Sequence, residues 1–327
     1  MQDDLAGYGW LKHVHFGPPR LRRALRLGQP VGSANTTDPD ALSGDRLWPR
    51  DRAIMRHNLL HRIVPNGYLE PASTATGHAF LEALVHYEGD ADALLALRVA
   101  AANATVNADG RATLDNVNSD PLSIAHRLRD MNCAHRRGFA WAATNPNRGF
   151  DPTPGSWVAA GDRQIGWIAS ASAYDSATGR LFVNNSATQE IFYQNALLAD
   201  QFLNFDAFVV PHASARTIAQ MLVDHLIDTY AANFTTPPRS WNCLPFNTSG
   251  AGPSPEVAGF FVPSALKLWQ DTDDSRYYDW ALLNLFALLG ASLSGDGWEG
   301  RLNEYVFGAE NAEALLSGIN WRTGQQV

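Results

Sequence analysis

Apolar residues recur every three or four positions over several long stretches of the chain, which is the spacing of one face of an α-helix. Two stretches share a further pattern: an amphipathic helix ends in an aromatic residue, an acidic elbow follows, and a second amphipathic helix begins. They are residues 78–104, with the elbow Glu88-Gly89-Asp90, and residues 257–291, with the elbow Asp271–Asp274. Such hairpins bury their apolar faces on one another, and an array of them can close into a ring. The pattern therefore predicts a mainly α fold, an (α/α) barrel or toroid of helical hairpins.

The rest of the chain is predicted to be mostly helical, with one interruption. Further helices are expected over 53–64, 121–144, 188–205, 214–232 and 308–317. Residues 145–187 are instead rich in Pro and Gly, and residues 174–183 have the pattern of a β-hairpin, with turn residues between strand formers. We expect a small irregular or β insertion near 145–187, lying over a cleft. No segment has the composition of a linker, so residues 1–327 are expected to form a single toroid domain.

The composition of the chain limits the classes of molecule that it is expected to bind. The chain has 327 residues and a net charge of -8, which disfavours nucleic-acid binding because phosphates require a basic surface. No run of about 18 apolar residues occurs, so no membrane span is expected. Ten Trp and fifteen Phe offer apolar faces on which sugars could stack, although core packing explains them equally well. We expect a carbohydrate or another small molecule as the partner, and the oligomeric state stays open.

Two features of the sequence indicate the cellular compartment in which the protein is expected. Five Asn-x-Ser/Thr sequons occur, at Asn35, Asn103, Asn184, Asn233 and Asn247. Cys133 and Cys243 could form one disulfide or remain two buried thiols. The N-terminus of this sequence has no signal-peptide pattern, but a mature form would have lost it. We expect a secreted or extracytoplasmic glycoprotein.

The first candidate site is Trp48-Pro-Arg-Asp51, at the start of an expected helix. Arg50 and Asp51 can hold two sugar hydroxyls, and Trp48 offers a stacking face. The structural alternative is that Asp51 caps the helix by accepting hydrogen bonds from backbone amides.

The second candidate site is Asp296-Gly-Trp-Glu299 together with Glu304, on a Gly-rich loop after the second hairpin. Glycoside cleavage requires two carboxyl groups about 5–10 Å apart. Desolvation beside Trp298 would raise the pKa of Glu299 and keep it protonated as the acid. The alternative is a solvated turn followed by an acidic residue at a helix start.

With these residues, the chain resembles the six-hairpin (α/α)6 toroid superfamily of glycosidases and polysaccharide lyases. Trp48-Pro-Arg-Asp51 resembles the Trp-x-Arg-Asp motif of the glucoamylase-like branch, in which Arg and Asp hold the terminal sugar. Asp296-Gly-Trp-Glu299 resembles the Asp-x-Trp-Glu motif of that branch, whose Glu is the general acid. In this chain the two motifs lie much farther apart than in that branch. The resemblance implies the ring architecture, sugar binding by Arg50 and Asp51, and general-acid catalysis by Glu299.

Weaker patterns keep other functions open. Asp271-Thr-Asp-Asp274 resembles the proton-donor motif of class II terpene cyclases, but an exposed elbow and helix cap is the favoured interpretation. His57 and His61 have a spacing compatible with zinc, but no third ligand is evident, so we expect no metal and no cofactor. A lyase could use residues around the predicted β-hairpin or nearby His residues; for each, a core or cap role is the better single interpretation. They are Tyr174, Asp175, Asn184, Asn185, Glu190, Tyr193, His78 and His212.

The leading hypothesis is a glycoside hydrolase with a Trp-lined cleft. Glu299, with Asp51 or Glu304, supplies the carboxyl groups, and the sugar contacts come from Trp48, Arg50, Asp296, Trp298, Tyr174 and Asp175. The alternatives are a β-eliminating polysaccharide lyase, a terpenoid-type isomerase, dehydratase or cyclase with an aromatic pocket, and a glycan-binding protein without catalysis.

Overall fold

The computed structural model describes residues 56, 59–65, 81, 84–85, 89–106, 121–141, 155–171, 173–182, 189–231, 259–290, 315–316, 318, 320–323 and 325. The chain divides into two compact units. Unit 1 comprises Met1–Asn58, Ile227–Phe246 and Gly250–Val327, and unit 2 comprises Leu59–Leu226 with Asn247–Ser249. The single-domain interpretation stays a prediction.

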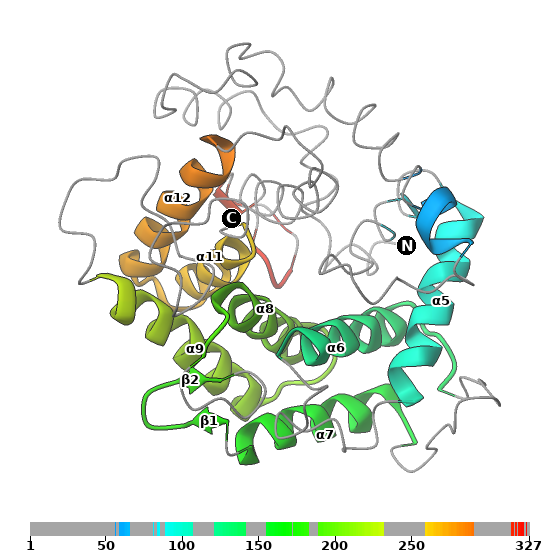
Figure 1. Cartoon of the computed structure of the whole chain (residues 1–327), viewed down its shortest axis with the longest axis horizontal. Coiled ribbons are helices and arrows are strands. Elements are labelled where there is room, and N and C mark those ends of the chain that lie inside the picture. Colours follow the sequence, from blue (N-terminus) through cyan, green and yellow to red (C-terminus); the bar gives the residue numbers. More distant parts are fainter. Residues whose placement is uncertain are drawn as a thin grey trace. The chain divides into compact units, whose positions relative to one another are not determined.

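The described residues are mainly helical, which confirms the expected α class (Figure 1). A short π-helix, η2, covers Leu59–Ile63. The α-helices are α5 (Ala91–Val106), α6 (Pro121–Arg136), α7 (Trp157–Ser170), α8 (Phe192–Phe208), α9 (Ala213–Ala231), α11 (Phe261–Thr272) and α12 (Ser275–Gly290). Strands β1 (Tyr174–Asp175) and β2 (Arg180–Leu181) pair antiparallel, with Tyr174 opposite Leu181. The β-hairpin predicted near residue 174 is therefore confirmed.

In unit 2, helices α6 and α8 pack on each other although α7 separates them in the sequence (Figure 1). The last turns of α6 form a buried cluster with the start of α7, through Met131, Ala134 and Trp157. The first half of α7 also lies against the end of α8, since a Cβ on Gly161 would overlap the Phe205 ring. The start of α7 is thus next to the ends of both α6 and α8. Hence α6 and α8 run in the same direction, and α7 runs the opposite way.

The first part of α9 also runs antiparallel to α8. His212, just before α9, follows the end of α8 closely, whereas His225 contacts Glu190, just before the start of α8. Every residue of α8 from Phe192 to Asp206 except Asn204 is buried. A helix that is buried on all sides belongs to the interior of its unit. Unit 2 is therefore built around α8, with α6 beside it running parallel.

The stretch 145–187 contains a 14-residue helix, α7, and the expectation of a mainly irregular or β insertion is wrong at this point. Ser156 caps the helix, because its Oγ accepts from the Ala159 amide at 3.1 Å. The buried face has helical spacing and includes Trp157, Ile165 and Ile168, but Gly161 and Gln164 interrupt it. Gly161 allows α7 to approach the Phe205 ring closely, and these two positions weakened the helical pattern in the sequence.

The second predicted elbow joins α11 to α12 as a helix-capping turn. Asp273 ends α11 in the left-handed conformation, with φ 57°, and its amide donates to the Trp269 carbonyl at 2.8 Å. Asp274 Oδ1 then accepts from the Arg276 amide at 2.9 Å and caps α12. Both aspartates are exposed. The interpretation of Asp271–Asp274 as an elbow and cap is confirmed.

The first elbow has the same construction, 184 positions earlier in the sequence. Gly89 has φ 62°, and its amide donates to the Val85 carbonyl at 3.1 Å. Asp90 Oδ1 accepts from the amides of Asp92 and Ala93, each at 3.0 Å, and so caps α5. Buried positions also correspond between the two hairpins: Leu84 with Leu268, Ala93 with Tyr277, Leu97 with Ala281, and Ala101 with Leu285. The two segments are therefore structural repeats, as their shared pattern predicted.

Candidate functional site

The structure describes only part of the predicted site. Seven of the residues proposed for catalysis or sugar binding lie outside the described residues: Trp48, Arg50, Asp51, Asp296, Trp298, Glu299 and Glu304. His57, His78, Asn184, Asn185 and Cys243 lie outside them as well, so no disulfide between Cys133 and Cys243 is tested. Cys133 itself is buried in α6. His61 lies exposed on η2, and Tyr193 is buried in α8.

Asp175 organises the turn of the β-hairpin. Its Oδ2 accepts from the Thr178 hydroxyl at 2.7 Å, and its Oδ1 accepts from the Ala177 amide at 2.9 Å. The Thr178 hydroxyl, then the Ala177 amide, hold the pKa of Asp175 below its usual value. Both oxygens are therefore already engaged in local hydrogen bonds, as expected of an Asp that shapes a turn.

Tyr174 joins the same hairpin to α9. Its hydroxyl donates to Met221 Sδ at 3.5 Å, and the side chain is half-buried. Burial, with a smaller contribution from the Asp175 charge, raises the pKa of Tyr174. Gly179 lies so close to the Met221 carbonyl that a Cβ would overlap it, and its φ of 73° also favours glycine. The hairpin is thus held tightly against α9.

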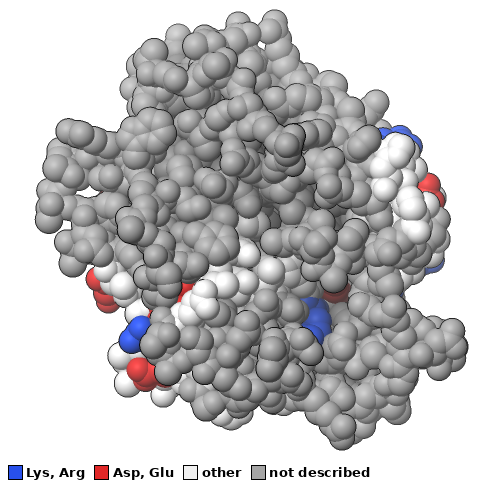
Figure 2. Space-filling model, in the orientation of Figure 1, with Lys and Arg blue, Asp and Glu red and all other residues white. Residues whose placement is uncertain are grey.

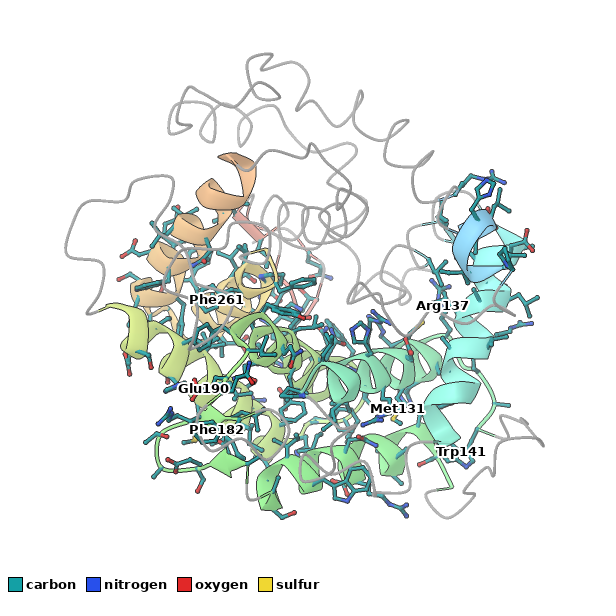
Figure 3. All side chains as sticks on the ribbon, viewed as in Figure 1. Met131, Arg137, Trp141, Phe182, Glu190 and Phe261 are labelled. Atoms are coloured by element: carbon teal, nitrogen blue, oxygen red, sulfur yellow. The ribbon has the colours of Figure 1, made fainter. Side chains whose placement is uncertain are left out.

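A buried ionic cluster lies beneath this hairpin, and sequence reasoning identified only one of its members. We call Arg180, Glu190 and His225 the Glu190 cluster. Glu190 Oε1 accepts from Arg180 Nε at 2.7 Å, and Oε2 lies 2.9 Å from His225 Nε2. The Glu190 side chain is 1% exposed, that of His225 is 10% exposed, and that of Arg180 is 40% exposed. Figure 3 shows Glu190 between α8, α9 and the hairpin.

The basic partners determine the charge of Glu190. Burial by itself raises the pKa of this carboxyl, but hydrogen bonds from His225 and Arg180, together with their positive charges, outweigh burial, and the pKa lies below its usual value. Arg180 in turn lies 4.8 Å from the centre of the Phe182 ring, and Asn195 Nδ2 donates to the Leu181 carbonyl at 3.1 Å. The cluster therefore joins three segments: the hairpin, the residues just before α8, and α9.

The geometry identifies the Glu190 cluster as a structural ionic clamp. Each oxygen of Glu190 has a basic partner, and the carboxylate is ionised, so it is poorly suited to donate a proton as a general acid. Sequence reasoning singled out Glu190 only through its position after the hairpin. His225 lies 35 residues away, and no motif connects the two.

His212 forms a second His–carboxylate pair and is also structural. Its Nδ1 accepts from the Ala215 amide at 3.1 Å, so His212 caps α9, and its Nε2 lies 2.8 Å from Asp162 Oδ1. The His212 amide donates to the buried Asp206, which Arg216 also binds through two nitrogens. The sequence favoured a core or cap role for His212, and because both ring nitrogens have protein partners, the structure assigns it the cap role.

Charged residues elsewhere in the described part of the chain do not indicate a further binding site. On the face shown in Figure 2, the Lys and Arg side chains of the described residues lie in small separate groups and form no broad basic patch. Within the described part of the chain, no group of three or more His, Cys, Asp or Glu residues is placed to hold a metal ion. The helices described there include none with the length and apolarity to cross a membrane. Comparison with protein-family models, curated proteins and solved structures finds no match to this chain.

Proposed function

We propose that the chain is a glycoside hydrolase built on a ring of helical hairpins. The observation that supports the ring is the alternation of helix direction in unit 2, where α6 and α8 pack in parallel and α7 and α9 run the opposite way. Parallel inner helices joined through antiparallel outer ones are the arrangement that consecutive helical hairpins form when they close around an axis. The matching elbows in the two units support the same repeat.

In this proposal the carboxyl groups of Glu299 and of Asp51 or Glu304 cleave the glycosidic bond. Glu299 protonates the glycosidic oxygen, and the neighbouring Trp298 raises its pKa by excluding water. Asp51 or Glu304 provides the second carboxylate, which activates water or attacks the sugar. Trp48 stacks on the sugar, and Arg50 and Asp296 hold its hydroxyls. The five sequons accord with a secreted, glycosylated enzyme.

The test compares the wild type with Glu299→Gln on a panel of neutral and uronate-containing polysaccharides. New reducing ends and the absorbance of unsaturated products are measured together. We expect reducing ends without unsaturation from the wild type, and a loss of about a hundredfold or more in Glu299→Gln. Asp279→Asn, an exposed change on α12, is the matched control and should retain activity.

Two results would overturn the assignment. Reducing ends released at the wild-type rate by Glu299→Gln would remove Glu299 from the acid role. Unsaturated products would show β-elimination, and the chain would then be a lyase. Silence of the wild type across the whole panel, in a sample whose circular dichroism shows folded helices, would favour the terpenoid-type or non-catalytic alternatives.

A further inference from the structure

Positive charge in this chain is carried almost entirely by arginine. Of the 25 Lys and Arg residues, only Lys12 and Lys267 are lysines. Lys267 lies on α11 within a run, Phe261–Leu268, whose members are all buried, and it is 6% exposed. A Lys is rarely buried to this extent without partners that offset the loss of hydration. Neighbouring groups must therefore offset the hydration that the Lys267 ammonium loses on burial.

Trp321, from the C-terminal segment, is one of those surroundings. Lys267 Nζ lies 5.3 Å from the centre of the Trp321 ring, and Arg322 Cζ lies 4.3 Å from it. Trp321 is 4% exposed. An ammonium beside an aromatic face is stabilised by the negative potential of the ring, more so when water is excluded. The indole therefore both shields Lys267 and stabilises its charge.

Two consecutive residues at the end of α11 hold this segment in place. Asp271 Oδ1 accepts from Trp321 Nε1 and from Arg322 Nε, each at 2.9 Å, and Oδ2 accepts from Arg322 at 2.6 Å. Gln270 Oε1 accepts from the Trp321 amide at 2.9 Å, and its Nε2 donates to the Leu315 carbonyl at 3.2 Å. These contacts engage the segment before its turn, at Leu315, and within the turn, at Trp321 and Arg322.

The C-terminal segment also has order of its own. Asn320 Oδ1 accepts from the amides of Arg322 and Thr323, and the Asn320 amide donates to the Gln325 carbonyl at 2.8 Å. The turn presents Trp321 and Arg322 to α11 as a preformed unit. Asp271 therefore joins α11 to the turn through both Trp321 and Arg322, and the turn also has hydrogen bonds of its own.

We propose that Leu315 and the turn of residues 320–323 form a strap whose opening controls chemical access to Lys267. Closed, the strap keeps the ammonium beneath Trp321; open, it exposes the one amine of α11 to acylating or carbonyl compounds. Asp271 is the latch, because it binds Trp321 and Arg322 at once. A lysine suits such a gated site because its amine, unlike a guanidinium, can lose its proton and react. This inference does not depend on the proposed hydrolase activity.

The test measures acylation of Lys267 in the folded full-length chain by an N-hydroxysuccinimide acetate ester, read peptide by peptide by mass spectrometry. Acylation of Lys12 reports the strength of the reagent, and the chain in urea defines the fully open rate. Arg322→Gln removes the paired hydrogen bonds from the strap side, and Asp271→Asn removes the charge of the latch. Asp279→Asn is the control, because it removes an exposed carboxylate from the neighbouring helix.

We expect Lys267 in the wild type to react far more slowly than in urea, and each latch variant to accelerate the reaction by about tenfold, since charged hydrogen bonds contribute that much. Asp279→Asn should react at the wild-type rate. Wild-type acylation as fast as in urea would overturn the proposal. So would unchanged acylation in Arg322→Gln, which lies at the surface end of the pair and can be read even if Asp271→Asn fails to fold.

Discussion

Replacing Glu190 by Gln removes the negative charge of the Glu190 cluster without changing the shape of the side chain. The new amide can still accept one hydrogen bond from Arg180, but its NH2 group then faces His225 Nε2, 2.9 Å from the position of Oε2. His225 must present Nε2 as a hydrogen-bond acceptor or lose this contact. Arg180 keeps its charge beside a neutral partner.

The cost follows from burial. Removing one partner of a fully buried ion pair typically costs about 3–5 kcal/mol. Arg180 is 40% exposed and can recover part of its hydration, which lowers the cost. We expect Glu190→Gln to reduce the free energy of unfolding by about 2–3 kcal/mol at pH 7. The measurement is urea unfolding followed by far-UV circular dichroism, with the m-value checked for two-state behaviour.

The same variant has a definite pH dependence. The pKa of Glu190 in the folded chain lies below the ordinary Glu value of 4.5, because hydrogen bonds from His225 and Arg180 and their charges outweigh burial. The carboxylate therefore contributes its full stabilisation above about pH 4.5, and this is lost as the pH falls through the folded-state pKa. The difference between the wild type and Glu190→Gln should be largest near neutral pH and should shrink below pH 4.5.

Asp228→Asn is the matched control. Asp228 also binds an arginine, Arg276, at 2.9 Å, but both side chains are exposed, at 66% and 37%. Exposed pairs contribute about 0–1 kcal/mol, so this variant should unfold nearly as the wild type does. A Glu190→Gln variant as stable as Asp228→Asn at pH 7 would refute the interpretation of the cluster as a clamp.

Four further substitutions, followed by urea unfolding, test the packing and the elbows. Gly89→Ala should destabilise by about 1 kcal/mol, because φ is 62° and the strain is in the backbone, since no atom crowds the site. Gly166→Ala, at an exposed position of α7, should instead stabilise by up to about 1 kcal/mol. Equal effects of the two substitutions would contradict the backbone argument. Gly161→Ala should cost about 1–3 kcal/mol because its Cβ would overlap the Phe205 ring, and a neutral result would contradict this close approach. Asp274→Ala should cost about 1 kcal/mol by removing a helix cap; no loss would exclude capping.

Local chemistry made the elbows predictable. An acidic residue after an aromatic helix end, followed by a new apolar face, indicates an N-cap within a few residues, and Asp90 and Asp274 fill that role. The β-hairpin was predictable for the same reason, since turn residues between Tyr174 and Leu181 specify a tight connection. Signals of this kind need only neighbouring residues.

Features that depend on distant partners were not predictable in the same way. Helix α7 was missed in part because Gly161 and Gln164 interrupt its apolar face; Gly161 fits against Phe205, a residue far away in sequence. The pairing of Glu190 with His225 likewise depends on a contact between α9 and the residues just before α8, 35 positions apart in the sequence. Glu299 and its companion residues stay predictions from short motifs, and the structure describes none of them.

The burial of Lys267 has a consequence for enzymes that cut proteins. A protease that cleaves only after lysine has two targets in this chain, after Lys12 and after Lys267. The second bond lies inside α11, and a protease active site accepts extended backbone, so α11 must unwind before it can be cut. Appearance of a fragment that begins at Leu268 therefore times the transient opening of this hairpin. Because lysine is so scarce, the rate of this single cleavage reports how often α11 opens.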